Sequence, residues 1–306
     1  MARSCVSAGR GKAVGEGHRW LGHRPASGNR PTSSGGVGNA LSAVDVHRQE
    51  VINQGFTMLE SVIPTDEVGQ VCEQVTAAAV GHDIANVPAG RGAVSGLINQ
   101  TQCFVPYLVE PRLLGLTQAL LGEHVRVSYT STIVALPGAT KLKWHADWPF
   151  NQHNAGHLDA PYPDAVMHLT SIWMLTDFTH GNGATFIVPG SHREPNNPTG
   201  GYGMGEFDDH PDAKQMTGKA GSVMVMDSRM WHAAPANTSE EARIGLAIRW
   251  APWWLNLDVL MAGSDERRRM VDEPGRKDNQ VPAVDRAVFE GLDAPVQTLF
   301  RHWVRD

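Results

Sequence analysis

Two residues of metal-binding types stand close together in the segment KWHADWPF, residues 143–150. His145 and Asp147 are separated by one residue, and on an extended strand such residues point to the same face. An imidazole and a carboxylate would therefore converge on one point. Both groups are common ligands of divalent transition metals. The spacing predicts the first two ligands of a metal site, and a third has to come from another part of the chain.

A candidate third ligand is His232, in the segment MDSRMWHAAP that follows a run of strand-forming residues. With His145 and Asp147 it would give two imidazoles and one carboxylate. This is the facial triad of non-haem Fe(II) oxygenases, which leaves metal positions open for O2 and a second reactant. An HxD pair alone is weak evidence, because short His and Asp combinations arise by chance, so the surrounding sequence has to supply the specificity.

Arg243 begins the strand-like segment RIGLAIRW, eleven residues after His232. Alternation along a strand puts Arg243, Gly245, Ala247 and Arg249 on one face and the apolar residues on the other. The small residues beside Arg243 leave room for an anion, and the guanidinium fork suits a carboxylate bound through both oxygens. The pattern predicts a carboxylate site next to the metal.

The elements that would hold these residues are mostly strands. Between residues 124 and 252, strand-like runs are separated by Pro, Gly and Asn, without helices between them. Such spacing favours a sandwich or barrel over a parallel α/β sheet. We expect strands at Val125–Thr130, Leu142–Trp148, Val166–Thr176, Ala184–Val188, Ser222–Asp227, Met230–Ala233 and Arg243–Trp250. Helices are predicted from Pro64 onward and at Pro111–Leu121.

Composition limits the class of protein. The chain has 306 residues, 41% of them hydrophobic, a net charge of −6 and a pI near 6.1. This excludes the basic surface that binds nucleic acid. Three widely spaced cysteines indicate a reducing compartment, so we expect a cytoplasmic protein. No apolar run is long enough for a membrane span.

The expected domain organisation has two parts. Residues 1–42 are rich in Gly, Ser and basic residues and are predicted to be a disordered or over-extended start, with a targeting segment as the alternative. Residues 43–306 are predicted to be one domain, with a β core at about 124–252. Charged segments at residues 255–306 are expected to form solvated helices outside the core.

The HxD pair, the distal His232, Arg243 and the segment GNGATFIVPGSHR at residues 181–193 together resemble the phytanoyl-CoA dioxygenase family of Fe(II)/2-oxoglutarate-dependent oxygenases. The resemblance covers residues 54–250. It implies a double-stranded β-helix, which is a cupin-like jelly roll, and thus an all-β core with flanking helices. The implied cofactors are Fe(II), the cosubstrate 2-oxoglutarate and O2.

The resemblance also implies roles for single residues. It makes His145, Asp147 and His232 the iron ligands and Arg243 the partner of the distal carboxylate of 2-oxoglutarate. Trp173 is similar in placement to a tryptophan that lines the family's cosubstrate pocket. Many members have a serine where this chain has Ala234, so another group must assist the carboxylate. Thr185 and Gln102 are the candidates.

The activity implied by the resemblance is hydroxylation of a small organic molecule, coupled to conversion of 2-oxoglutarate to succinate and CO2. Related halogenases resemble this pattern with a small residue in place of the carboxylate, so Asp147 disfavours halogenation. One alternative is a non-catalytic metal-binding jelly-roll protein. Another is a zinc hydrolase with the same three ligands, which would need a general base near the metal-bound water. The identity of the substrate and the oligomeric state are not readable from the sequence.

Overall fold

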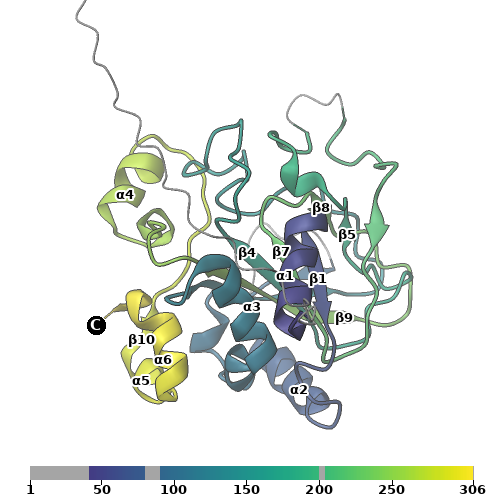
Figure 1. The fold of residues 1–306 in the computed structure, drawn as a ribbon, viewed down its shortest axis with the longest axis horizontal. Helices are drawn as coiled ribbons and strands as arrows, with labels where there is room; N and C mark the ends of the chain where they lie inside the picture. The colour runs from purple at the N-terminus through teal and green to yellow at the C-terminus, as the bar shows by residue number, and fades with distance from the viewer. Residues whose placement is uncertain (1–40, 80–89, 200–203, 306) are drawn as a thin grey trace, which may run out of the picture. The chain divides into compact units, whose positions relative to one another are not determined.

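The computed structural model describes residues 41–79, 90–199 and 204–305. Its α-helices are α1 (Ala43–Gln54), α2 (Val68–Ala79), α3 (Pro111–Leu121), α4 (Asp265–Arg267), α5 (Arg286–Glu290) and α6 (Ala294–Phe300) (Figure 1). Its strands are β1 (Phe56–Leu59), β2 (Arg91–Gly92), β3 (Arg126–Ala135), β4 (Leu169–Met174), β5 (Phe186–Ile187), β6 (Lys214–Gln215), β7 (Val223–Asp227), β8 (His232–Ala233), β9 (Arg243–Ala251), β10 (Val284–Asp285) and β11 (Val304–Arg305). Short 3-10 helices lie at Leu97–Asn99, Val105–Val109, Ser191–Arg193, Asp258–Leu260 and Arg301–Trp303, and a π-helical turn lies at Arg268–Asp272.

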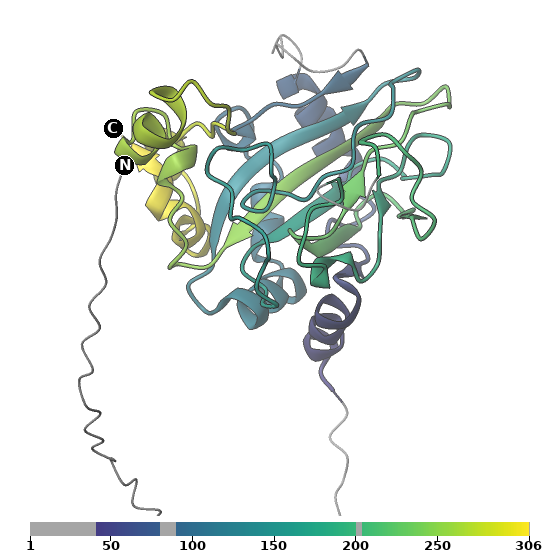
Figure 2. The same cartoon turned by 90° about the horizontal axis from the view of Figure 1, so that it is seen from above.

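The main sheet has six antiparallel strands in the order β1-β7-β4-β9-β3-β2. Its long strands β3 and β9 run side by side (Figure 2). Strands that are neighbours in the sheet are distant in sequence, so the sheet is built from long-range strand pairs and not from hairpins. The sheet places Arg243 and Arg249 of β9 beside residues of β3, and it places Arg249 beside Thr170 of β4 as well.

The second sheet is smaller and carries one of the candidate metal ligands. Its order is β6-β5-β8, and an antiparallel bridge between His145 and His232 adds one further position beside β8. Two antiparallel sheets, one long and one short, form the jelly-roll core that the sequence predicts. The predicted fold class, an all-β core with flanking helices, is confirmed.

The helices pack through apolar residues at helical spacing. In α2, Val68, Val71 and Val75 are buried, and in α3 Leu113 and Leu116 are buried. These residues belong to the same apolar cluster as Trp173 and Leu246 of the main sheet, which is therefore covered by helices on one face. Both helices were expected from the sequence.

Helix α1 was not predicted, although its start carries a clear signal. Ser42 accepts a hydrogen bond from the backbone N–H of Asp45, and the Asp45 side chain accepts one from the Ser42 N–H in return. Gly55 ends the helix with φ of +92°, and a Cβ there would collide with Met230 and His192. The predicted extension ends at residue 42, one residue after the described part begins. Residues 1–40 lie outside the described residues.

Two expectations for the fold need correction. The segment Leu142–Trp148 is not a continuous strand, because only His145 forms a ladder bridge there. The C-terminal segment forms helices as expected, and α5 has no buried residue, but α6 is not a solvated helix outside the core. Val296, Leu299, Phe300 and Trp303 are buried in the main apolar cluster, and β10 pairs with β11. The prediction was based on the charged residues at 265–269, whereas the apolar residues that pack into the core come later, at Val284–Trp303.

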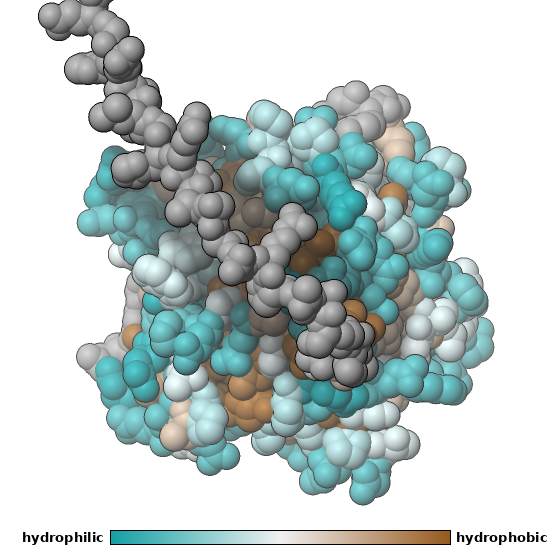
Figure 3. Space-filling model, in the orientation of Figure 1, coloured by the Kyte–Doolittle hydropathy of each residue, from teal (hydrophilic) through white to brown (hydrophobic). Residues whose placement is uncertain are grey.

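Large apolar side chains that remain exposed in the described residues include Phe207, Trp253 and Trp254. On the face drawn in Figure 3, hydrophilic residues dominate the rim and apolar residues gather toward the middle. Within residues 41–79, 90–199 and 204–305, no helix is long and apolar enough to cross a membrane.

Candidate metal centre

The two candidate histidines are held by each other's backbone. The N–H of His145 donates to the carbonyl of His232, and the N–H of His232 donates to the carbonyl of His145, both at 3.0 Å. The imidazoles lie side by side, with ring centroids 4.1 Å apart. This reciprocal pair explains why residues far apart in the sequence present their side chains at one place.

Each imidazole is oriented so that Nε2 faces the shared site. The Nδ1 of His145 lies 3.0 Å from the carbonyl oxygen of Lys143, and the Nδ1 of His232 lies 2.9 Å from that of Met230. A carbonyl can only accept, so Nδ1 carries a proton in each ring, and in the neutral form of the imidazole this leaves the lone pair on Nε2. A hydrogen bond of this kind on the far nitrogen is typical of metal-binding histidines.

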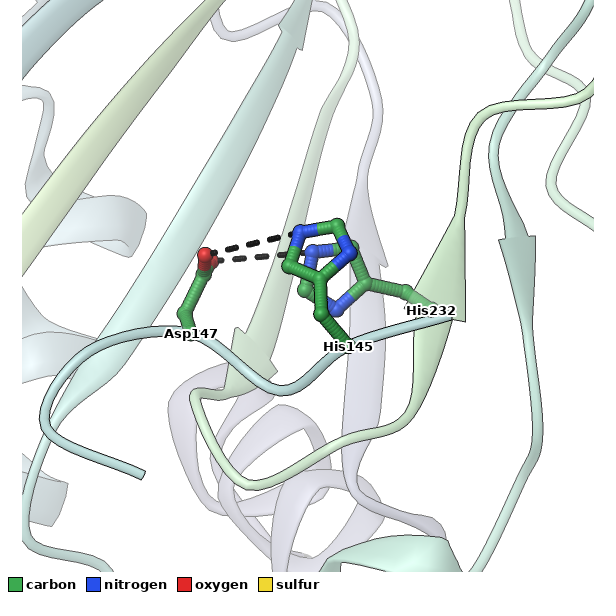
Figure 4. A group of neighbouring side chains, drawn as sticks. All are labelled: His145, Asp147 and His232. Carbon is green, nitrogen blue, oxygen red and sulfur yellow. Dashed lines mark ion pairs between the residues drawn. The ribbon is translucent and has the colours of Figure 1, made fainter. Parts of the chain in front are cut away.

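Asp147 completes the group (Figure 4). Its Oδ1 lies 4.0 Å from Nε2 of His145, and its Oδ2 lies 3.7 Å from Nε2 of His232. The potential ligand atoms of the three residues lie within 4.8 Å of one another. Two imidazoles and one carboxylate at this spacing fit a divalent metal such as Fe(II).

Electrostatics keep His145 and Asp147 in the protonation states that a metal needs. Burial, followed by the charge of His232, lowers the pKa of His145 to about 4, so it is neutral near pH 7. Burial by itself would raise the pKa of Asp147. The charges of Arg249 and the two histidines, with a hydrogen bond from Thr170, outweigh burial and hold the pKa of Asp147 well below its usual range.

The candidate carboxylate partner Arg243 lies in the same cavity, which has a volume of about 190 Å3. Its Nη1 donates to the carbonyl of Gly183 at 2.6 Å and lies 3.4 Å from Oγ1 of Thr185. Its Nε is buried and has no partner within the described residues. Burial, then the charge of Arg91, lowers the pKa of Arg243 to about 9, so the guanidinium still carries its charge at neutral pH. A buried cation with a spare donor favours an anionic ligand.

Arg91 lines the cavity as well, although no sequence pattern indicated a role for it. Its Nη2 donates to the carbonyls of Thr140 and Pro235, while its Nη1 is buried without a partner in the described part of the chain. Strand pairing brings it there, since Arg91 lies opposite Ala135 of β3, and Ala135 lies opposite Arg243. Two guanidinium groups therefore line the same cavity, close enough for the charge of Arg91 to lower the pKa of Arg243.

The structure does not bring Trp173 or Gln102 to this cavity. In β4, Thr170 and Ile172 line the cavity, so alternation turns Trp173 to the opposite face, where it is buried in the apolar core. Its indole N–H donates to Ser171. Gln102 is exposed, and its side chain donates to the carbonyl of Ile98. Thr185 does line the cavity.

A buried histidine lies behind the metal centre and gives a pH-dependent stability. The His168 ring is fully buried and hydrogen-bonded on both nitrogens, to Ser128 at 2.9 Å and to Ser228 at 2.8 Å. Burial lowers its pKa to about 3. Below about pH 6.5 the unfolded chain therefore binds a proton that the folded chain does not, and folding loses stability as the pH falls.

We predict that His168→Asn reduces this pH dependence. In the wild-type protein, His168 should lower the free energy of unfolding by about 1.4 kcal/mol for each unit that the pH falls between about 6.5 and 3. The variant should lack this part of the slope. Urea unfolding at about pH 7, 6 and 5 measures the slope. His180→Asn, which removes an exposed imidazole, is the control. An unchanged slope in His168→Asn would contradict the assignment.

Comparison with known proteins gives a family match. The family model described as phytanoyl-CoA dioxygenase (PhyH) matches residues 52–245. A relative named dioxygenase af480, from Aspergillus fumigatus, is 33% identical over 139 residues, which is 44% of this chain and 40% of that protein. An ectoine dioxygenase from Bordetella parapertussis is 27% identical over 235 residues, covering 67% of this chain and 73% of that protein.

Solved structures show the same fold at low sequence identity. The epimerase SnoN from nogalamycin biosynthesis, crystallised with Fe3+, alpha ketoglutarate and nogalamycin RO, has a TM-score of 0.56 and 18% identity, covering 69% of this chain and 84% of that one. EctD from S. alaskensis has a TM-score of 0.55 and 20% identity, covering 72% and 80%.

The family model covers well over half of the chain, and it includes the HxD pair, His232 and Arg243. The expected family and fold are confirmed, and iron, 2-oxoglutarate and O2 are confirmed as the cofactors of the family. The chain belongs to the phytanoyl-CoA dioxygenase family of Fe(II)- and 2-oxoglutarate-dependent oxygenases.

Proposed function

We propose that this enzyme hydroxylates a small organic substrate. One oxygen atom of O2 enters a C–H bond of the substrate, and the other converts 2-oxoglutarate to succinate with release of CO2. Bound iron supplies the O2 activation, and the protein binds and orients the reactants. The single observation that carries this proposal is the meeting of His145, Asp147, His232 and Arg243 in one cavity.

In this proposal each cavity residue has one task. His145, Asp147 and His232 bind Fe(II), and Arg243 binds the distal carboxylate of 2-oxoglutarate. The Oγ1 of Thr185 lies 3.4 Å from Nη1 of Arg243. Its hydroxyl group assists in binding the distal carboxylate, as the serine does in family members that have one at the position of Ala234. Arg91 adds a second positive charge at the same end. The cavity volume of about 190 Å3 suits a small dicarboxylate rather than a large substrate.

The experiment is a screen for succinate release by iron-loaded protein with 2-oxoglutarate, O2 and a set of small molecules. Slow succinate release without substrate and faster release with a substrate are expected. A well-folded, iron-loaded protein that forms no succinate in either case would favour the alternative of a non-catalytic metal-binding protein. Metal analysis of anaerobically purified protein tests the zinc hydrolase alternative, which requires zinc in place of iron.

A larger cavity is the proposed site of the organic substrate. It has a volume of about 740 Å3 and is adjacent to the smaller cavity, with which it shares Leu142 and His145. Its other lining includes the exposed Phe207 and the ion pair of Lys143 with Glu206 at 3.3 Å. A substrate here would lie beside the metal, with apolar contacts to Leu142 and Phe207 and polar contacts to the ion pair.

We predict that Phe207→Ala weakens binding of the organic substrate only. Phe207 is 58% exposed, so its removal should leave the fold intact. Loss of one apolar contact should raise the KM for a substrate found in the screen by about 10-fold. The KM for 2-oxoglutarate should not change. Trp254→Ala, which removes another half-exposed aromatic ring outside both cavities, is the matched control. Equal effects of the two variants would contradict the proposed site.

We also propose that the enzyme acts in the cytoplasm without nucleic-acid partners. Cys72 and Cys103 are both free thiols, which supports a reducing compartment. The net charge of −6 supports the absence of a nucleic-acid surface.

A further inference from the structure

A row of three side chains crosses the main sheet next to the metal centre. Arg249 of β9 pairs with Tyr129 of β3 on one side and with Thr170 of β4 on the other. The Arg249 guanidinium lies 4.8 Å from the centre of the Tyr129 ring, which fixes its plane. Because all three residues lie on paired strands, their relative positions are set by the sheet and not by a loop.

This row holds the Asp147 carboxylate at both oxygens. Arg249 donates from Nη2 to Oδ1, and Thr170 donates from Oγ1 to Oδ2 at 2.7 Å. Asp147 itself is 3% exposed and lies outside the strands, in the segment that follows the His145 bridge. Thr170 is held in turn by Ser228, whose Oγ is 3.0 Å away. The carboxylate therefore cannot turn about its Cβ–Cγ bond without losing one of these partners.

The orientation of this carboxylate matters for the reaction because an octahedral metal has six positions. If Fe(II) and the 2-oxo acid were bound, two imidazoles, one carboxylate oxygen and the two donor atoms of the 2-oxo acid would fill five of them and would leave one for O2. A carboxylate can also bind a metal through both oxygens. If Asp147 did so, all six positions would be filled and O2 would have no place to bind.

We propose that Arg249 and Thr170 are positioning residues that hold Asp147 so that it binds iron through one oxygen. This inference rests on the proposed function of the site. The Arg249 charge does not help metal binding directly, since a guanidinium next to a divalent cation repels it. Its effect is on coordination number and turnover. Loss of Arg249 should therefore slow the reaction without weakening the metal site, a combination that a folding defect would not produce.

The test compares Arg249→Gln and Thr170→Val with the wild-type enzyme. The first readout is Co(II) binding by calorimetry together with the Co(II) absorption spectrum in the presence of 2-oxoglutarate. Both variants should bind Co(II) at least as tightly as the wild type. Their spectra should differ from the wild-type spectrum, because the second oxygen of Asp147 would replace a solvent ligand on Co(II). The second readout is succinate formation with Fe(II), which should fall by about 10- to 100-fold.

Two further variants complete the design. Arg249→Lys keeps the charge but lacks the planar fork and should recover part of the activity. Arg126→Gln is the matched control for loss of an arginine from the main sheet. Arg126 lies on β3 and does not line either of the two cavities near the metal site.

Wild-type turnover in both Arg249→Gln and Thr170→Val would overturn the proposal. The proposal would also be overturned if the variants bound Co(II) more than about 10-fold more weakly than the wild type and gave the same Co(II) spectrum. The two residues would then increase the affinity for the metal without setting the orientation of Asp147. Failure of the oxygenase function itself is a different result. In that case the wild-type enzyme forms no succinate, while the Co(II) binding and spectra still decide whether Arg249 and Thr170 control the coordination of Asp147.

Discussion

His145→Ala is expected to reduce succinate formation on the order of 1,000-fold or more, the largest effect of any change at this site. The variant removes one of three metal ligands, an imidazole held in place by its bond to the Lys143 carbonyl, and the two ligands that remain should bind iron much less tightly. Iron content after anaerobic loading should fall in parallel with activity. The fold should survive, because the backbone bridge between residues 145 and 232 does not involve the side chain.

His180→Ala is the matched control for this prediction. His180 is exposed, and its ring bonds to Gln215 at a distance from both cavities near the metal. It should retain wild-type turnover and iron content. Wild-type turnover in His145→Ala would show that the metal, if bound, is held elsewhere, and the proposed function would then be wrong.

The sequence was enough to predict the metal-binding group because its members are defined by short-range signals. The HxD spacing, the position of His232 after a strand, and the alternation in RIGLAIRW each need only local geometry. The structure brings these residues together as predicted, although the strand expected for residues 142–148 is reduced to one bridge at His145. The reciprocal hydrogen bonds of that bridge are sufficient to fix the geometry.

Residues that depend on pairing between distant strands were beyond prediction. Alternation tells which residues share a face, but not which face looks into the cavity. Trp173 was placed at the cavity only by its resemblance to a family tryptophan, and the structure buries it on the opposite face of β4. Alternation also put Arg249 on the face of Arg243, yet its contact with Asp147 depends on the path of the segment after His145. Arg91 reaches the cavity only because β2 pairs with β3.

The pairing of β2, β3 and β9 bears directly on how the enzyme would select its cosubstrate. It brings Arg91 to the end of the small cavity where Arg243 lies, and the only acidic residue lining that cavity among the described residues is Asp147, which is paired with Arg249. The excess positive charge at the Arg243 end is therefore not neutralised by the protein. A ligand with a carboxylate at that end should bind much more tightly than one without.

Arg243→Gln is accordingly expected to raise the KM for 2-oxoglutarate by about 100-fold, because a charge-assisted bond to the distal carboxylate is lost in a buried site. Metal binding and the KM for the organic substrate should stay near wild-type values. The sharper measurement is the preference for 2-oxoglutarate over 2-oxopentanoate, which lacks the distal carboxylate. The wild-type enzyme should discriminate strongly between them, and Arg243→Gln should lose most of that preference. If the variant kept the full preference, Arg91 or another group would be the carboxylate partner, and the role given to Arg243 would be rejected.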